Sequence, residues 1–172
     1  LVRAYLEAGV AFDEPRYLDI AREVLDYLLR EMVSEQGGLH SATDADSEGV
    51  EGKFVVWTPD EVEQVLGAQA ARACVWFDIR PEGNFEGKSI PNTPRPLDEV
   101  ASLLNTSAEQ LAVEIEQWRE KLYAARLERV APGLDDKVLV GWNALAIGAL
   151  AEGARVLGER RYLDAARRAV DF

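Results

Sequence analysis

The feature that most restricts the fold of this chain is an internal repeat. When residues 1–27 are aligned without gaps against residues 146–172, ten of the 27 positions hold the same residue. In each copy a stretch rich in small residues is followed by a short break, at residues 13–15 or 158–160. Apolar residues at i, i+3 and i+4 spacing then predict a helix with one buried face. Two copies of this helix–turn–helix unit predict a mainly α-helical array of αα-hairpins.

The two copies are cut at different points of the repeat. The first begins within a helix, and the second stops at Phe172, where the first continues to about Met32. A helix cut on its apolar face exposes surface that needs a partner. We therefore expect residues 1–172 to be a single fragment of a longer array, and such a fragment to form a dimer through its exposed helix faces.

Residues 36–58 interrupt the helical pattern and are expected to form a β insertion. Lys53–Trp57 is β-branched and aromatic, which predicts a strand. Pairing of this strand with Leu39–Ala42 would give a small β-hairpin around an acidic loop. The insertion would then separate the first copy from the helices that follow it.

Helix start signals place the remaining elements. Thr58-Pro59-Asp60-Glu61 predicts a helix that ends at Gly67, and a capping box at Thr106–Glu109 predicts a helix to about Arg129. Residues 80–96 have the composition of a loop and linker. The second copy of the hairpin, residues 135–172, would begin with a long helix that Asp135 or Asp136 caps.

The charge balance excludes several classes of partner. The net charge is −12, whereas nucleic-acid-binding proteins carry a basic patch and anionic membranes attract basic segments. No apolar run approaches the ~20 residues that cross a bilayer, and no Gly-rich phosphate loop is present. Cys74 is the only cysteine, which excludes an internal disulfide, and its apolar neighbours predict a buried, inert thiol. We expect a cytoplasmic protein with no cofactor and no metal site of paired cysteines.

The first candidate site is the acidic loop inside the β insertion. Its ionisable residues are Asp44, Asp46, Glu48, Glu51 and Lys53. Crowded carboxylates raise one another's pKa, so one of them can become a proton donor near neutral pH. The spacing also matches the first positions of a calcium-binding EF-hand loop, but Val55 stands where the bidentate glutamate is required. Acid–base catalysis, a calcium site of another geometry and a solvated loop all stay open.

The second candidate site surrounds the start of the long helix in the second copy. Its candidate residues are Asp135, Asp136, Lys137, Trp142 and Asn143. Two adjacent acids exceed what a helix cap needs, and an aromatic face beside carboxylates and an amide suits a sugar ring. The alternative is structural: one Asp as the cap and the tryptophan in the core. His40 is a third candidate, either as a structural residue or as a general acid or base that binds substrate.

Four motifs in this chain resemble the YyaL-type, thioredoxin-domain-containing proteins (the family of spermatogenesis-associated protein 20). They are the segments 37–49, 51–61, 82–90 and 135–143. The resemblance covers essentially the whole chain. It implies a thioredoxin-like domain elsewhere in the full-length protein and, for this chain, a partial (α/α)6 toroid of the six-hairpin glycosidase type. The toroid is similar to N-acylglucosamine 2-epimerases and related sugar enzymes.

Two functions follow from these patterns. The first is a carbohydrate-active domain, a sugar hydrolase or epimerase, in which Asp44 or Asp46 and Asp135 or Asp136 supply the acid and base. Its ligand is a small sugar-like molecule that stacks on Trp142. The second is a non-catalytic binding or scaffold toroid that serves the attached thioredoxin-like domain. The residues alone leave open whether the chain is an enzyme.

Overall fold

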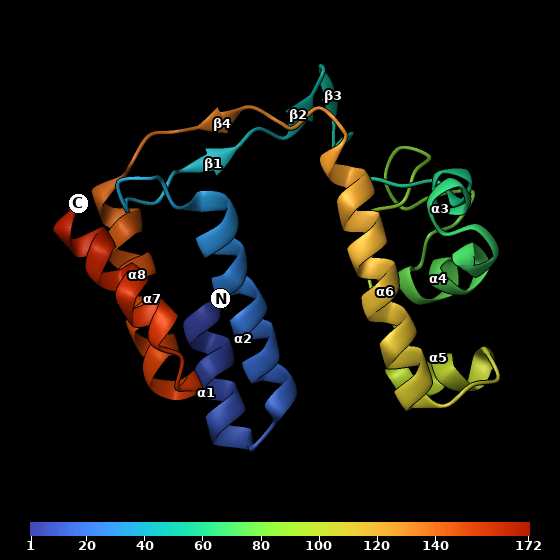
Figure 1. The fold of residues 1–172 in the computed structure, drawn as a ribbon, viewed down its shortest axis with the longest axis horizontal. Coiled ribbons are helices and arrows are strands. Elements are labelled where there is room, and N and C mark those ends of the chain that lie inside the picture. The colour runs from blue at the N-terminus through green and yellow to red at the C-terminus, as the bar shows by residue number, and fades with distance from the viewer. The chain divides into compact units, whose positions relative to one another are not determined.

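The computed structural model describes all residues of the chain, and it is mainly α-helical (Figure 1). The elements in chain order are α1 (Val2–Phe12), α2 (Pro15–Tyr27), a π-helical turn (Leu28–Met32), β1 (Ala42–Thr43), β2 (Asp46–Ser47), β3 (Val50–Glu51), α3 (Pro59–Leu66), a 3₁₀ turn (Gly67–Gln69), α4 (Ala70–Phe77), α5 (Leu97–Leu103), α6 (Ala108–Leu127), β4 (Leu134–Asp135), α7 (Val140–Leu157) and α8 (Arg160–Asp171). The chain divides into two compact units: unit 1 is residues 1–43 with 134–172, and unit 2 is residues 44–133. No helix is both long enough and apolar enough to cross a bilayer.

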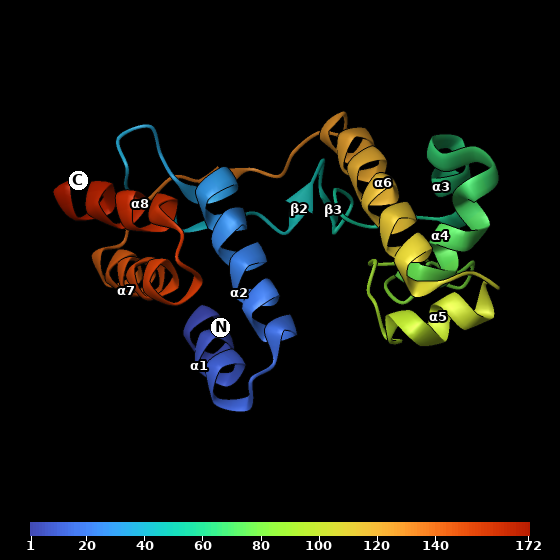
Figure 2. The same cartoon turned by 60° about the horizontal axis from the view of Figure 1, so that its bottom comes forward.

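Unit 1 contains both copies of the repeat, and each copy forms the predicted helical hairpin. α1 turns into α2 through Asp13, and α7 turns into α8 through the equivalent Gly158. Both residues adopt the left-handed conformation, with φ of 52° and 72°. The following residue, Glu14 or Glu159, is the N-cap of the second helix in each hairpin. Sequence equivalence therefore extends to the turn geometry, and the two hairpins lie side by side in Figures 1 and 2.

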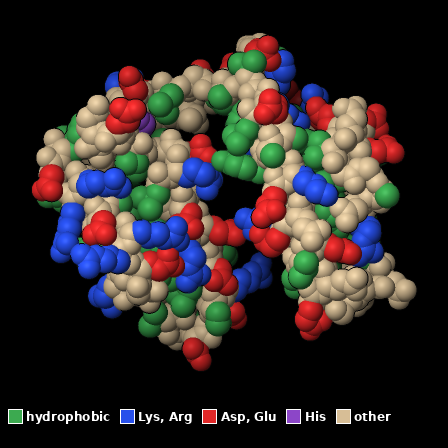
Figure 3. All heavy atoms as spheres, in the orientation of Figure 1, with side chains coloured by type: hydrophobic (Ala, Val, Ile, Leu, Met, Phe, Trp, Pro, Cys, Tyr) green, Lys and Arg blue, Asp and Glu red, His purple; other side chains and the backbone are tan.

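Small residues let the two hairpins pack closely. Their shared core is formed by Val2, Leu6, Ala21, Leu25, Ala149, Leu150, Tyr162, Ala165 and Ala166. Gly153 of α7 faces Leu25 of α2 so closely that a Cβ atom at Gly153 would clash with the leucine side chain. Acidic and basic side chains intermingle over these helices (Figure 3), which fits the ion pairs that join the hairpins.

The strand pairing of unit 1 differs from the prediction. β1 pairs with β4 in antiparallel register, with Ala42 opposite Asp135 and Thr43 opposite Leu134. The predicted pairing of Leu39–Ala42 with Lys53–Trp57 is wrong, because these partners belong to different units. Strand β1 therefore pairs with β4, which precedes α7, and not with a strand close to it in the sequence.

The predicted strand at Lys53–Trp57 is also wrong. The backbone turns after Gly52, whose carbonyl accepts hydrogen bonds from the N–H groups of Val55 and Val56. Only Trp57 keeps an extended contact, through two hydrogen bonds of 2.8 Å with Ser89. The guanidinium of Arg129 donates to the carbonyls of residues 53, 54 and 56, which stabilises the turn from a distant part of the sequence.

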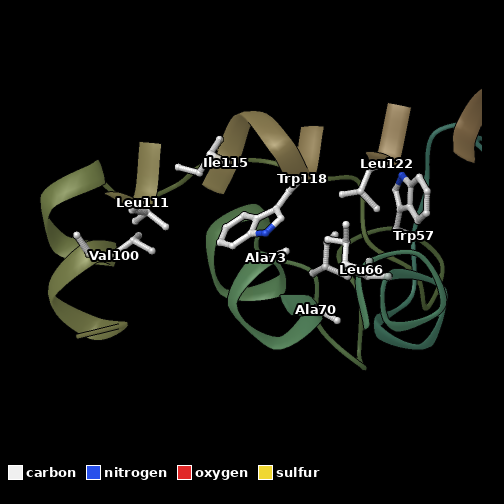
Figure 4. Close-up of a cluster of buried hydrophobic side chains, with 12 residues drawn as sticks. Trp57, Leu66, Ala70, Ala73, Val100, Leu111, Ile115, Trp118 and Leu122 are labelled. Atoms are coloured by element: carbon white, nitrogen blue, oxygen red, sulfur yellow. The ribbon is translucent and has the colours of Figure 1, made fainter. Parts of the chain in front are cut away.

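Unit 2 packs α3, α4 and α5 against one long helix, α6 (Figure 4). Trp118, at the centre of α6, is fully buried and lies among residues from α3 and α4. Trp57 is also buried in this core, and Trp76 packs partly buried against it. Cys74 of α4 is half-buried at this core, and burial raises the pKa of its thiol.

The predicted start of α3 is confirmed, whereas the predicted start of α6 is one residue too early. Thr58 and Glu61 form the predicted capping box of α3, with Glu61 N–H donating to Thr58 Oγ1 at 3.2 Å. α6 begins one residue later than predicted. Ser107 is its N-cap and accepts from the N–H of Gln110, whereas Thr106 lies outside the helix.

Candidate functional site

The start of α7 is the best-defined part of the candidate site, and it is built differently from the prediction. The N-cap is Leu139, which offers no side-chain hydrogen bond. The prediction that Asp135 or Asp136 caps this helix is therefore wrong. Asp135 instead lies in β4, where pairing with β1 holds the backbone extended. Trp142 consequently lies in the first turn of α7, and 56% of its surface is exposed.

Asn143 connects this first turn to the end of the other repeat copy. Its side chain is buried, with Oδ1 accepting from the N–H of Leu39 at 2.8 Å and Nδ2 donating to the carbonyl of Leu39 at 2.9 Å. Nδ2 also donates to the carbonyl of Leu139 at 3.1 Å. The amide therefore bonds to backbone, and its geometry favours a structural role over hydroxyl binding.

His40 follows directly on this anchored leucine. Its Nδ1 lies 3.3 Å from the carbonyl oxygen of Asp136, and its backbone N–H donates to the carbonyl of Met32 at 2.8 Å. Because a carbonyl can only accept, Nδ1 must carry the proton in this contact. In the neutral imidazole Nε2 is then the acceptor, so His40 can accept a hydrogen bond from a ligand.

Ser41 is a site residue that the sequence did not reveal. Its Oγ donates to the carbonyl of Asp135 at 3.1 Å, and its N–H donates to the same oxygen at 3.2 Å. These bonds fix the backbone of the two adjacent acids. Their partners are 94 positions away in the chain, so no local pattern could have shown them.

The two adjacent acids have different environments. Asp135 forms an ion pair with Lys137 at 3.0 Å, and the hydrogen bond from this lysine lowers the pKa of the Asp135 carboxyl. Asp135 therefore stays ionised and is poorly suited to donate a proton. The carboxylate of Asp136 is exposed and makes no hydrogen bond or ion pair in the structure. Of the two, Asp136 is the acid whose oxygens are available to a ligand.

Large exposed apolar side chains surround the start of α7. Besides Trp142 they are Leu134, Leu139, Val140 and Leu145, with exposed fractions from 39% to 85%. Single exposed apolar residues are normal, whereas a large contiguous apolar patch is typical of a binding surface. We call these five residues the α7 apolar surface.

The acidic loop lies in unit 2 and is a tight β-hairpin. β2 pairs with β3, with Ser47 opposite Val50. The two residues between them, Glu48 and Gly49, both have positive φ, of 53° and 75°, as a type I′ turn requires. Glu48 and Gly49 therefore form the turn of this hairpin. Ser47 is buried, and its hydroxyl donates to the carbonyl of Val130 at 2.6 Å.

The charged side chains of this loop point into local contacts or solvent. Glu48 pairs with Lys53 at 2.6 Å, and Asp44 Oδ1 accepts from the N–H of Asp46 at 3.2 Å. Glu51 is exposed. No group of three or more metal-ligating side chains converges here or elsewhere in the chain. The described conformation therefore offers no calcium cage.

The predicted site residues thus fall into two groups. Unit 1 holds His40, Asp135, Asp136, Lys137, Trp142 and Asn143, and unit 2 holds Asp44, Asp46, Glu48, Glu51 and Lys53. The contacts above bring His40 and Asp136 together and join Asp135 to Lys137. Catalysis by a pair with one acid from each group stays a prediction.

Comparison with known proteins relates the chain to one set of animal proteins. No family model matches it. The chain is 29% identical to spermatogenesis-associated protein 20 of Homo sapiens over 198 aligned residues, which cover all of this chain and 25% of that protein. It is 29% identical to an uncharacterized protein of Caenorhabditis elegans, with 89% of this chain and 24% of that protein covered. It is 28% identical to spermatogenesis-associated protein 20 of Mus musculus, with 98% and 25% covered. The chain spans about a quarter of the length of these curated relatives.

Proposed function

We propose that this chain is part of a helical-hairpin domain that binds a sugar-like ligand at the start of α7. The observation that carries the proposal is the position of Trp142, an exposed indole in the first turn of a helix whose approach segment carries a carboxylate without a partner. Sugar rings present apolar C–H faces that stack on aromatic rings, and their hydroxyl edges need fixed acceptors and donors.

Residues of the segments that meet before the start of α7 carry such acceptors and donors. Asp136 offers two carboxylate oxygens, and His40 offers Nε2. Lys137 adds a donor, although its ammonium is shared with Asp135. Ser41 and Asn143 hold the two backbone segments in place through hydrogen bonds to the backbone of Asp135 and Leu39.

The same proposal includes a reaction on the sugar, either hydrolysis or epimerisation. A hydrolase would pair Asp44 or Asp46 with Asp135 or Asp136, with the carboxyl groups about 5–5.5 Å apart for retention or about 6.5–9.5 Å apart for inversion. The ion pair of Asp135 favours Asp136 as the partner from unit 1. An epimerase would instead use His40 to move a proton.

The proposed place of this chain within a longer protein rests on the family resemblance. The similarity to spermatogenesis-associated protein 20, together with the two equivalent hairpins, supports a partial (α/α)6 toroid. In the longer protein this toroid would accompany a thioredoxin-like domain. The fold alone does not imply a reaction, so the site residues have to be tested directly.

The test is a titration with glucose, N-acetylglucosamine and glucose 6-phosphate. Binding is measured by tryptophan fluorescence and by the shift of the melting temperature. Stacking on Trp142 should change the emission of the exposed indole and raise the melting temperature. Trp142→Ala and Asp136→Asn should each weaken binding at least tenfold, a loss of about 1.4 kcal/mol. The control Arg155→Ala removes an exposed side chain from the last turn of the same helix and should bind normally. Absence of binding to all three sugars, or equal binding by Trp142→Ala, would overturn the proposal.

A second function is favoured by the α7 apolar surface. Five large apolar side chains exceed what one sugar ring covers, and they suit a protein segment. The alternative is therefore a non-catalytic scaffold that presents clients to the thioredoxin-like domain. Binding of unfolded, apolar-rich peptides that Val140→Ser abolishes, with no binding of sugars, would favour the scaffold.

A further inference from the structure

The connection between α4 and α5 contains three closely spaced prolines, Pro91, Pro94 and Pro96. Proline fixes φ at about −65°, and it restricts the residue before it to extended or polyproline II conformations. From Ile90 to Pro96 only Asn92 is neither a proline nor followed by one. The residue types therefore impose a polyproline II course on this segment.

The backbone of the segment has the properties of a polyproline II helix. Pro96 has φ of −61° and ψ of 152°, close to the ideal angles of about −75° and +145°. The N–H groups of Thr93 and Arg95 form no hydrogen bond with the rest of the chain, as expected of a helix without internal hydrogen bonds. Thr93, Pro94, Arg95 and Pro96 are all exposed. The segment is thus a stiff and accessible length of backbone.

One edge of this segment is attached to the body of unit 2. Because a polyproline II helix has three residues per turn, residues three apart lie on the same edge. Ser89 is fully buried, and its backbone forms two hydrogen bonds of 2.8 Å with Trp57. Three residues later, the N–H of Asn92 donates to the carbonyl of Phe77 at 3.0 Å. Ser89 and Asn92 therefore tether the segment and leave its other two edges for a partner.

The other two edges carry a basic residue, two prolines and the residues that precede these prolines. Lys88, Pro91 and Pro94 lie on one edge, and Ile90 and Thr93 lie on the other. All five are exposed except Pro91, which is half-buried. The surface of the segment is therefore mostly apolar, with one cation at its N-terminal end.

Asn84 holds the first proline dipeptide in position. Its Oδ1 accepts from the N–H of Ile90 at 2.8 Å, and its Nδ2 donates to the carbonyl of Ile90 at 3.0 Å. Both backbone groups of Ile90 are thus satisfied within the chain, while 41% of the surface of this residue stays exposed. The Ile90-Pro91 dipeptide is consequently presented in a fixed conformation, which lowers the entropy cost of binding.

The spacing of these residues matches the ligands of SH3 domains. An SH3 domain binds P-x-x-P segments in a groove lined by aromatic side chains, and the preformed polyproline II helix loses little entropy there. Two dipeptides, here Ile90-Pro91 and Thr93-Pro94, fill two pockets of such a groove. A cation beyond the first dipeptide pairs with acidic side chains beside the groove. Lys88 stands at that position and forms no ion pair or hydrogen bond through its side chain.

We propose that residues 88–94 are a docking segment for a protein with an SH3-type groove. The aromatic pockets of the partner would receive Ile90-Pro91 and Thr93-Pro94, and its acidic residues would pair with Lys88. Because the contact involves one short segment, the interface is small and the binding is reversible.

An NMR titration of the isotope-labelled chain with a panel of SH3 domains tests the proposal. At least one domain should bind with a dissociation constant in the micromolar range, and the signals of residues 88–96 should shift most. Pro91→Ala and Pro94→Ala should each weaken binding at least about tenfold, because each removes a ring that fills a pocket. Lys88→Glu should weaken binding as much, because it places a carboxylate against the acidic residues of the partner.

Pro96→Ala is the matched control, since it removes an exposed proline from the same segment but outside the P-x-x-P spacing. It should bind like the wild type, and circular dichroism should show that all variants keep their helices. Absence of binding to every SH3 domain of the panel would overturn the proposal. So would unchanged binding by Pro94→Ala or Lys88→Glu, or an equal loss in Pro96→Ala.

Discussion

The phenol of Tyr162 donates a hydrogen bond of 2.8 Å to Oδ1 of Asp26, across the interface between the two repeat copies. The same hydroxyl accepts from the guanidinium of Arg161 at 2.8 Å. Tyr162 is fully buried, and this burial, together with the bond to Asp26, raises the pKa of its phenol. The equivalent Tyr17 of the first copy forms no such bond, so substitution of Tyr17 is a natural control for substitution of Tyr162.

Tyr162→Phe should lower the free energy of unfolding by about 1–2 kcal/mol, because the carboxylate of Asp26 loses a donor. The folded state favours the protonated phenol, so this contribution is complete below pH ~10 and is lost as the pH rises above that value. The wild type should therefore lose stability faster than Tyr162→Phe at alkaline pH, as measured by urea unfolding. Tyr17→Phe should follow the wild type; parallel curves for Tyr162→Phe and the wild type would contradict the assignment.

A second pH effect is expected at acidic pH. Glu159 accepts hydrogen bonds from Arg22 and then from Arg161, and these lower the pKa of its carboxyl. Its contribution is present above the ordinary carboxyl pKa of about 4.3 and is lost as the pH falls through the lower folded value. Glu159→Gln should therefore flatten the acid limb of the stability curve. An acid limb as steep as that of the wild type would contradict the assignment.

Two glycines of α7 should respond in opposite directions to alanine. Gly153→Ala adds a methyl group that collides with buried Leu25, and overpacking of this kind costs about 1–3 kcal/mol. Gly148→Ala meets open space and should stabilise the helix by about 0.5–1 kcal/mol. Leu25→Val should rescue Gly153→Ala in part, as a double-mutant cycle in urea would show. Additive effects would mean that the two side chains do not meet.

Asn143→Ala should destabilise unit 1 by about 2–3 kcal/mol, because both backbone groups of Leu39 lose their partner in a buried place. Amide hydrogen exchange at Leu39 should become faster in the same variant. Leu145→Ala on the exposed side of the same helix should change stability by less than about 0.5 kcal/mol. A stable Asn143→Ala variant with slow exchange at Leu39 would show that the anchor is dispensable.

Arg129→Ala should destabilise unit 2 by about 2–3 kcal/mol. The guanidinium donates to three backbone carbonyls and lies 4.1 Å above the ring of Trp57. Arg129→Lys should recover less than half of the loss, because an ammonium cannot reproduce the planar stacking and the multiple donors. Lys121→Ala on α6 is the exposed control. Full recovery by lysine would mean that charge alone is required.

The sequence predicted those parts of the fold that depend on neighbours along the chain. The helices of the repeat and the capping box at Thr58 follow from spacings of three or four residues, which helix geometry fixes. Glu14 and Glu159 mark the breaks between these helices. The accuracy of these predictions reflects the local origin of helical hydrogen bonds. Trp118 is buried together with Ile115 and Leu122, which lie three and four residues from it, so helical spacing also indicates its burial.

The errors share a physical cause, which is dependence on partners far away in the sequence. Lys53–Trp57 has the composition of a strand, but Arg129 bonds to its carbonyls from more than 70 residues away. Asp135 resembles a helix cap, yet its backbone is held extended by Ser41 and by pairing with Ala42. Each strand has two residues, too short for a periodic signal.

The ligand-binding role of the candidate site stays a prediction. His40, Asp136 and Trp142 are exposed or half-exposed in unit 1, as a ligand-facing role requires. Asn143 is buried, and its amide bonds to backbone. The sequence offered no means to separate these cases, because residue type does not show which way a side chain points.

The pairing of Thr43 with Leu134 also bears on how such a chain can change during evolution. The chain leaves unit 1 after one of these residues and returns at the other, so both ends of the intervening segment meet at one point. A segment attached in this way can lengthen, shorten or be exchanged without moving the helices at its base. Homologous chains should therefore differ most in length between these two positions, while the lengths of the two helices within each copy stay constant.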